Sequence, residues 1–182
     1  MSKRIRQALP RVAALIFVIG VTVIIALNQD KAEALKVLGY PGVFLLAMIG
    51  SATVIFPVPH LAFTFAMGAV LSPWLVGILA GLGDTIGEMT GYLAGFALED
   101  VADRVKLYAR FERWMEINGD LTLFILALIP NPLFDMASMA GGLAGFPLPR
   151  FLLATWGGKT LKAIGFAWAG YYGVQWVVEL FG

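Results

Sequence analysis

The sequence has no cysteine, a single histidine and few charges, and each shortage excludes a class of protein. Without cysteine the 182 residues contain no disulfide framework, thiolate metal site or cysteine nucleophile. Charged residues make up 14% of the chain, against about 25% in a typical soluble domain. A net charge of +1 gives no basic field, so we expect no nucleic acid as a partner. With a mean hydropathy of +0.82, the composition indicates an all-α polytopic membrane protein.

Three segments are long and apolar enough to be read as spanning helices. A helix needs about 20 apolar residues to cross the ~30 Å hydrocarbon core of a bilayer. Leu9–Leu27, Trp74–Leu98 and Phe151–Leu180 meet this length. The competing interpretation of the first segment is a removed signal peptide, with Ala32 and Ala34 at the cleavage site. The charges that separate the apolar run from that site favour a retained helix.

Proline turns divide two other apolar stretches into pieces that are too short to span. Val43–Phe56 and His60–Leu71 flank Pro57-Val58-Pro59, and about 14 residues make only about 21 Å of helix. A second pair, Leu121–Ile129 and Leu133–Gly145, flanks Pro130-Asn131-Pro132. Each pair predicts a re-entrant hairpin with an irregular tip, which is tolerated at membrane depth only where protein or water covers it. The alternative is a pair of short, tilted, kinked spans. The tips are therefore candidate site walls: Pro57, Pro59, Pro130, Asn131 and Pro132.

The second half of the chain repeats the first. Pro57 matches Pro130 and Gly68 matches Gly141 at a constant offset, and after one inserted residue Glu88 matches Lys162. With the N-terminus in the cytoplasm, nine Lys and Arg fall in inside loops and two in outside loops, as the positive-inside rule requires. This threading makes the halves antiparallel, an inverted repeat of the kind that many transporters use.

The expected organisation is an N-terminal transmembrane helix with an outer loop (residues 1–40), followed by one repeat-containing unit (41–182). That unit divides into the first hairpin and helix (41–98), a cytoplasmic amphipathic segment (99–120) and the second hairpin and helix (121–182). Glycines recur at every fourth residue from Gly83 to Gly95, a pattern of close helix packing.

The candidate site consists of the few charges inside apolar helices. Asp84 and Glu88 share one helix face, and Lys159 and Lys162 share one face of the matching helix. Pairing across the repeat would neutralise all four charges. They form either a static clamp or a protonatable centre that contacts a charged headgroup. Asp135, which could also cap a short helix, and His60 are weaker candidates beside the two turns.

No metal or cofactor is expected, because neither His60 nor Asp135 belongs to a cluster with metal-ligand spacing. The single histidine has no nucleophile or orienting acid placed by the sequence, so we expect no enzyme.

At these residues the chain resembles the DedA family, the bacterial branch of the VTT-domain (SNARE-associated Golgi protein) superfamily. The resemblance covers roughly residues 40–175. It rests on the proline turns, on Gly83-Asp84, and on the motifs Gly91-Tyr92-Leu93-Ala94-Gly95, Ile129-Pro130-Asn131-Pro132, Gly158-Lys159 and Gly170-Tyr171.

The resemblance implies two opposed re-entrant helices and lipid movement across the cell inner membrane, with polyprenyl phosphate or phospholipid as substrate and protons as a coupling ion in some members. Only Asp84 and the basic Lys159 carry over as site residues. Many members have an acid after the first turn and an arginine after the second. This chain has His60 at the first place and Leu133, Phe134 and Asp135 at the second.

We therefore expect a multi-pass inner-membrane lipid flippase or scramblase whose partners are membrane lipids. The alternatives are a proton- or cation-coupled small-solute transporter and an assembly factor without a transport cycle. A homo-oligomer is left open.

Overall fold

The described part of the chain is helical. The computed structural model describes residues 39–52, 60–97, 108–130 and 133–181, and no strand occurs in these ranges. The all-α prediction is confirmed. The expected helix Leu9–Leu27 and four of the tip residues, Pro57, Pro59, Asn131 and Pro132, lie outside the described residues. The helices are α3 (Gly39–Ala52), α4 (His60–Val70), α5 (Pro73–Ala97), α6 (Tyr108–Leu128), α7 (Leu133–Leu143) and α8 (Leu148–Phe181).

Proline and glycine set the helix ends close to the predicted limits. Pro73 is the first residue of α5, where its missing N–H costs no helical hydrogen bond, and the N–H of Val76 donates to the carbonyl of Ser72 at 3.0 Å. After α7, Gly145 has a φ of +61°, which a residue with a side chain rarely adopts. The N–H of Phe146 donates to Gly141 at 2.9 Å, which completes a Schellman turn before α8.

Helix α6 contains a kink at the end of the predicted amphipathic segment. Asn118 has non-helical dihedrals (φ −161°, ψ 83°), and its Oδ1 accepts the N–H of Leu121 at 3.2 Å, which caps the second part of the helix. Arg150 at the start of α8 holds Asp120 with two contacts, one of them Nε to Oδ1 at 3.1 Å. The kink therefore separates residues 108–117 from the arm that leads toward Pro130.

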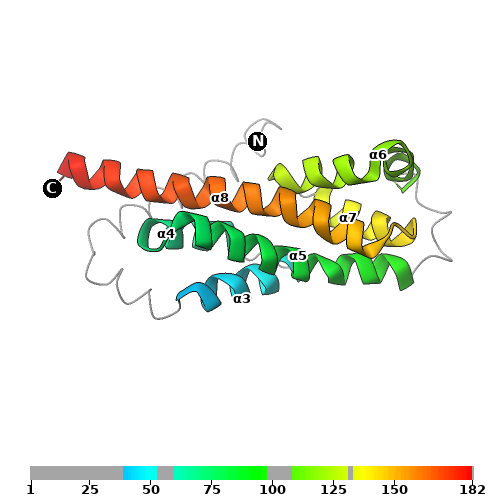
Figure 1. Cartoon of the computed structure of the whole chain (residues 1–182), viewed down its shortest axis with the longest axis horizontal. Helices are drawn as coiled ribbons and strands as arrows, with labels where there is room; N and C mark the ends of the chain where they lie inside the picture. The colour runs from blue at the N-terminus through cyan, green and yellow to red at the C-terminus, as the bar shows by residue number, and fades with distance from the viewer. Residues whose placement is uncertain (1–38, 53–59, 98–107, 131–132, 182) are drawn as a thin grey trace, which may run out of the picture.

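The two long helices lie side by side, and the shorter helices cover opposite ends of them (Figure 1). Helix α3 packs against α5, and α6 packs against α8. We call α3 and the part of α6 after the kink the first arms, and α4 and α7 the second arms. The second arms cross over, because α4 packs against α8 and α7 packs against α5. We call α3, α4 and α5 the first half, and the part of α6 after the kink, α7 and α8 the second half.

Equivalent backbone contacts recur in the two halves. Gly83 of α5 lies against the carbonyl of Phe44, and Gly158 of α8 lies in the same way against the carbonyl of Phe124. The crossed contacts recur as well, because Gly95 of α5 meets Met139 of α7, and Gly170 of α8 meets Phe65 of α4. Gly95 follows Gly83 by the same number of positions as Gly170 follows Gly158, so the two sets of contacts are in register. A Cβ at any of these glycines would overlap backbone atoms.

The glycines at every fourth position of α5 are all packing sites, as predicted. Gly83 and Gly87 lie against α3, whereas Gly91 and Gly95 lie against α7. Small residues allow helix backbones to approach closely where no large apolar core separates them. One stripe of α5 therefore binds a helix from each half.

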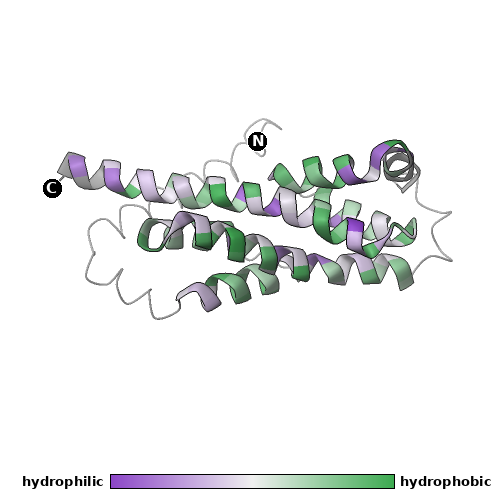
Figure 2. Ribbon diagram, viewed as in Figure 1, coloured by the Kyte–Doolittle hydropathy of each residue, from purple (hydrophilic) through white to green (hydrophobic). Residues whose placement is uncertain are grey.

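Many large apolar side chains are exposed, whereas several polar and charged side chains are buried. Ile49 is 50% exposed and Leu153 is 68% exposed, whereas Asp84 is fully buried. Figure 2 shows hydrophobic residues in every described helix, mixed with intermediate and hydrophilic ones along α8. Among the described residues, no helix has both the length and the apolarity needed to cross a membrane. The predicted spans Trp74–Leu98 and Phe151–Leu180 correspond to α5 and α8, and their spanning role stays a prediction.

Candidate functional site

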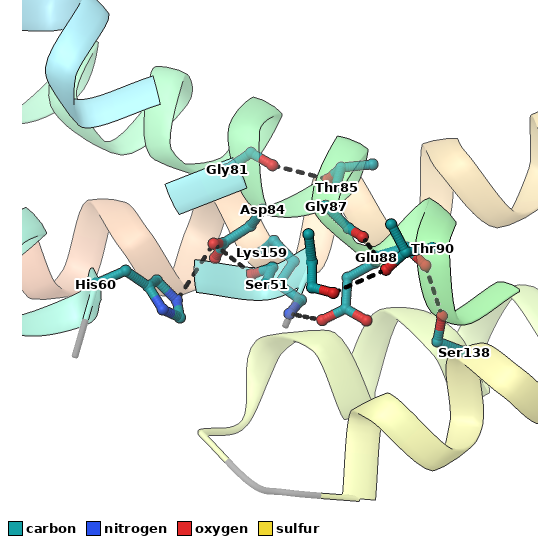
Figure 3. A network of polar contacts seen from close by, with 11 residues as sticks. Ser51, His60, Gly81, Asp84, Thr85, Gly87, Glu88, Thr90, Ser138 and Lys159 are labelled. Carbon is teal, nitrogen blue, oxygen red and sulfur yellow. Dashed lines mark hydrogen bonds and ion pairs between the residues drawn. The ribbon is translucent and has the colours of Figure 1, made fainter. Parts of the chain in front are cut away.

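A buried polar network lies between two apolar clusters. One cluster joins the first half to the later part of α8, with Met67 and Ala163 among its members. The other joins the second half to the later part of α5, with Leu123 and Phe151 among its members. The central network, as we call it, consists of Ser51, His60, Asp84, Glu88 and Lys159 (Figure 3).

Glu88 and Lys159 form a salt bridge between α5 and α8. Lys159 Nζ lies 2.5 Å from Glu88 Oε1, and the Lys159 and Glu88 side chains are 6% and 3% exposed. The ring of Phe134 lies 4.5 Å from the same ammonium. Two desolvated charges are tolerated only when they are paired this closely, so removal of either partner leaves a costly buried charge. This contact joins the halves at the centre of the molecule.

Asp84 accepts contacts from two segments of the first half. The Ser51 hydroxyl at the end of α3 donates to Asp84 Oδ1 at 2.7 Å. His60 Nε2, at the start of α4, lies 3.2 Å from the same oxygen, which is an ion-pair distance when the ring is protonated. The second oxygen, Oδ2, is buried and receives no hydrogen bond from any described residue. Asp84 therefore keeps one acceptor that the described side chains do not use.

Hydrogen bonds from hydroxyl groups join α3 and α7 to α5 beside these charges. Ser138 of α7 donates to the carbonyl of Glu88 at 2.9 Å, and Thr90 donates to the carbonyl of Ala52 at the end of α3 at 3.2 Å. Figure 3 shows Ser138 and Thr90 beside Glu88. The network is thus braced by helices from both halves.

Asp84 and Lys159 occupy equivalent positions with opposite charges. Asp84 directly follows Gly83 in α5, and Lys159 directly follows Gly158, the matching packing glycine of α8. Each is contacted by the start of the second arm of its own half, Asp84 by His60 of α4 and Lys159 by Phe134 of α7. The two halves therefore present a carboxylate and an ammonium in matching surroundings.

The structure brings four of the predicted charged or titratable candidates into one network: His60, Asp84, Glu88 and Lys159. Lys162 is half-buried on α8, and no described carboxylate lies within 4.0 Å of its ammonium. Direct pairing is thus seen for Glu88 and Lys159, and the neutralisation of all four charges stays a prediction. Asp135 is half-buried in the first turn of α7, near enough to act on the charge of Glu88. Pro130 is exposed, two residues after the end of α6.

Ser51 is a site residue that sequence reasoning missed. It lies in the apolar helix α3, one residue before the helix ends, and its hydroxyl is directed at Asp84. The available signal was a polar residue at the end of an uncharged run that leads into a proline turn. Within the described ranges, no three His, Asp or Glu side chains gather as ligands for a metal ion. The expectation of no metal stays a prediction.

These features define a class: a helical protein with two similar halves, many exposed apolar side chains and a buried ionic centre. The chain belongs to the VTT domain family, whose match covers residues 58–172. This match includes α4 to α7, most of α8 and every charge of the central network. The resemblance to the VTT-domain superfamily is thus confirmed.

A curated relative supports the membrane location. The chain is 31% identical over 109 residues to the vacuole membrane protein KMS1 of Arabidopsis thaliana. The alignment covers 48% of this chain and 26% of the relative, so the chain matches about a quarter of that protein's length. No solved structure is significantly similar to the chain.

Proposed function

We propose that this protein moves lipid headgroups across a membrane through a polar centre between its two halves, as a flippase or scramblase. The observation that carries the proposal is the central network, in which Asp84, Glu88 and Lys159 are buried where α5 and α8 meet. Ionisable residues inside a membrane are costly and mark pathways for ions or substrates. Membership of a membrane-protein family supports a transport role at this centre.

The spacing of residues along α8 supports a position of the network near the bilayer midplane. Arg150 precedes Lys159 by nine positions, and Trp168 follows it by nine, so each lies about 14 Å away along the helix. The ring centroid of Trp168 lies 5.3 Å from that of Tyr172, on which it stacks, and 5.8 Å from that of Trp74, which it meets edge-on. Aromatic clusters and arginines are typical of the two edges of a bilayer, which are about 30 Å apart. Lys159 would then lie midway between them.

The lengths of the shorter helices support two half-depth hairpins that enter from opposite faces. Helices α4 and α7 have 11 residues each, about 16 Å, which is half of the hydrocarbon core. The recurrence of the α5–α3 and α8–α6 contacts supports an inverted repeat. With α8 crossing the membrane, we propose the arginine end as the cytoplasmic side of an inner membrane and a cytoplasmic N-terminus.

Reconstitution into vesicles tests the proposal. Dithionite bleaches only the labelled lipids in the outer leaflet. Purified protein should therefore accelerate the loss of fluorescence by moving labelled lipids out of the inner leaflet, with either a phospholipid probe or a polyprenyl phosphate probe. Replacement of both Asp84 and Glu88 by their amides should abolish this acceleration. Gly165→Ala is the matched control, because outside its own stretch of helix no atom would lie within 4 Å of the added methyl group. Rates equal to those of empty vesicles with both probes would contradict the proposal.

The contact between His60 and Asp84 favours a second candidate, a proton-coupled transporter of small solutes. Histidine is the side chain that ordinarily changes charge near neutral pH, and here it meets a buried carboxylate. This candidate predicts Asp84-dependent proton flux into vesicles without movement of labelled lipid. Neither candidate is an enzyme, and the bond from Ser51 to Asp84 supports this, because a nucleophilic serine would donate to the histidine.

A further inference from the structure

A difference between the two halves points to a further binding residue. In the first half, α3 continues for two turns beyond its contact at Phe44 and ends at Ala52. In the second half, α6 continues for only one turn beyond the equivalent contact at Phe124 and ends at Leu128. The arm of the second half is therefore one helical turn shorter where it passes its long helix.

Lys162 lies opposite the missing turn. The last turn of α3 packs on Gly87, whose added Cβ would meet backbone atoms of Met48 and Ala52. Gly87 lies one turn beyond the packing glycine Gly83, and the residue one turn beyond the equivalent glycine, Gly158, is Lys162. Gly158 itself packs against the end of α6. A long cationic side chain thus stands where the first half has a helix turn packed on a glycine.

The charges around Lys162 do not neutralise it by direct contact. Lys159, which lies one turn away, is already bound to Glu88 at 2.5 Å. Asp84, Glu88 and Asp135 are near enough to act on the Lys162 charge, but no described carboxylate lies within 4.0 Å of its ammonium. A half-buried ammonium in a membrane requires an anionic partner or water. Among the described residues, the Lys162 ammonium therefore has no direct anionic partner.

We propose that Lys162 binds the phosphate group of the transported ligand beside the end of the shorter helix α6. This inference rests on the proposed function and assigns different roles to the two lysines. Lys159 holds the halves together through Glu88, and Lys162 meets the ligand. A lysine ammonium offers three donors and binds phosphate as a compact charge. Because the same chemistry is found in a lipid headgroup and in free phosphate, the test separates these sources.

The test measures binding of dodecyl phosphate to the whole protein in maltoside micelles by calorimetry. Lys162→Gln should raise the Kd about tenfold, the usual effect of losing one charged hydrogen bond, and Lys162→Arg should keep it within about threefold of wild type. Leu161→Ala, at an exposed neighbouring position, is the control and should leave the Kd unchanged. An unchanged unfolding temperature in Lys162→Gln would show that the loss is one of binding.

Two further results decide the assignment without depending on the variant. Dodecyl trimethylammonium, the cationic counterpart, should bind the wild-type protein at least tenfold more weakly than dodecyl phosphate. If millimolar inorganic phosphate competes with dodecyl phosphate, the free anion is sufficient for binding at Lys162. If it does not compete, the site requires a phosphate carried by a lipid. Equal affinity for both amphiphiles, or an equal Kd in wild type and Lys162→Gln, would overturn the assignment.

The outcomes also separate this inference from the proposed function. Lipid translocation that persists unchanged in Lys162→Gln overturns the role of Lys162 and leaves the function intact. Dodecyl phosphate binding without any lipid translocation by the wild-type protein overturns the function and retains the anion site.

Discussion

Asp84 and Lys159 stand at equivalent positions of α5 and α8, one as a buried carboxylate and the other as a buried ammonium. Each is contacted by the first turn of the short second arm in its own half, through His60 or Phe134. The halves are therefore similar in backbone packing and opposite in central charge. The field at the centre is therefore asymmetric, which gives it a polarity that two identical halves would lack.

Breaking the bridge between Glu88 and Lys159 should destabilise the protein strongly. Lys159→Met leaves the Glu88 carboxylate buried without its partner, so we expect the free energy of unfolding to fall by about 3–5 kcal/mol. Glu88→Met combined with Lys159→Met removes both charges and should restore most of this loss. Denaturant titration in mixed micelles, followed by circular dichroism, measures both effects. A single variant no less stable than the double variant would show that the bridge does not hold the halves together.

Close backbone contacts should make one glycine of α7 intolerant of any side chain. A Cβ at Gly142 would overlap the carbonyl of Tyr92 and the N–H of Phe96. Gly142→Ala must therefore separate α7 from α5, and we expect a loss of about 1–3 kcal/mol in unfolding free energy. Gly165→Ala is the control in open space and should gain up to about 1 kcal/mol from helix propensity. Similar unfolding curves for the two variants would contradict the close approach of α7 and α5.

The sequence predicts the helices well because their ends are set locally. Pro73 and Gly145 act through their own backbone geometry, so the start of α5 and the end of α7 can be read from neighbouring residues. The predicted second arm, His60–Leu71, differs from α4 only at its last residue. The fourfold glycine spacing of α5 likewise predicts close packing without any knowledge of the partner.

The pairing of the charges could not be predicted as well, because it depends on a register that glycine and proline fix only approximately. The sequence match equates Glu88 with Lys162, whereas the backbone contacts equate Asp84 with Lys159. One residue turns a side chain by about 100° around a helix, so a shift of one position changes which charges face each other. The role of Ser51 was missed for a related reason, since only the packing of α3 on α5 brings its hydroxyl to Asp84.

The hydroxyl of Tyr92 should contribute to stability where α5 meets the turn between α7 and α8. It donates to the carbonyl of Phe146 at 2.5 Å and ties α5 to the turn between α7 and α8. Tyr92→Phe leaves that buried carbonyl without this donor, so we expect a loss of about 1–3 kcal/mol in unfolding free energy. Tyr172→Phe, at a side chain that is 61% exposed, is the control and should change stability little. Equal effects of the two substitutions would indicate that the Phe146 carbonyl finds another donor.

Reversing the salt bridge should separate a transport site from a structural clamp. Glu88→Lys combined with Lys159→Glu keeps two opposite charges in contact between α5 and α8, so the protein should fold with nearly the stability of the wild type. The new ammonium would lie one turn from Asp84, and the new carboxylate would lie one turn from Lys162. The second change would neutralise the cation that we assign to the ligand.

A structural clamp works equally well when its two charges are exchanged, whereas a site that binds a charged headgroup does not. We therefore expect dithionite assays on vesicles with the swapped protein to show at least a tenfold slower translocation at unchanged unfolding temperature. Wild-type translocation by the swapped protein would mean that the bridge serves only to join the two halves.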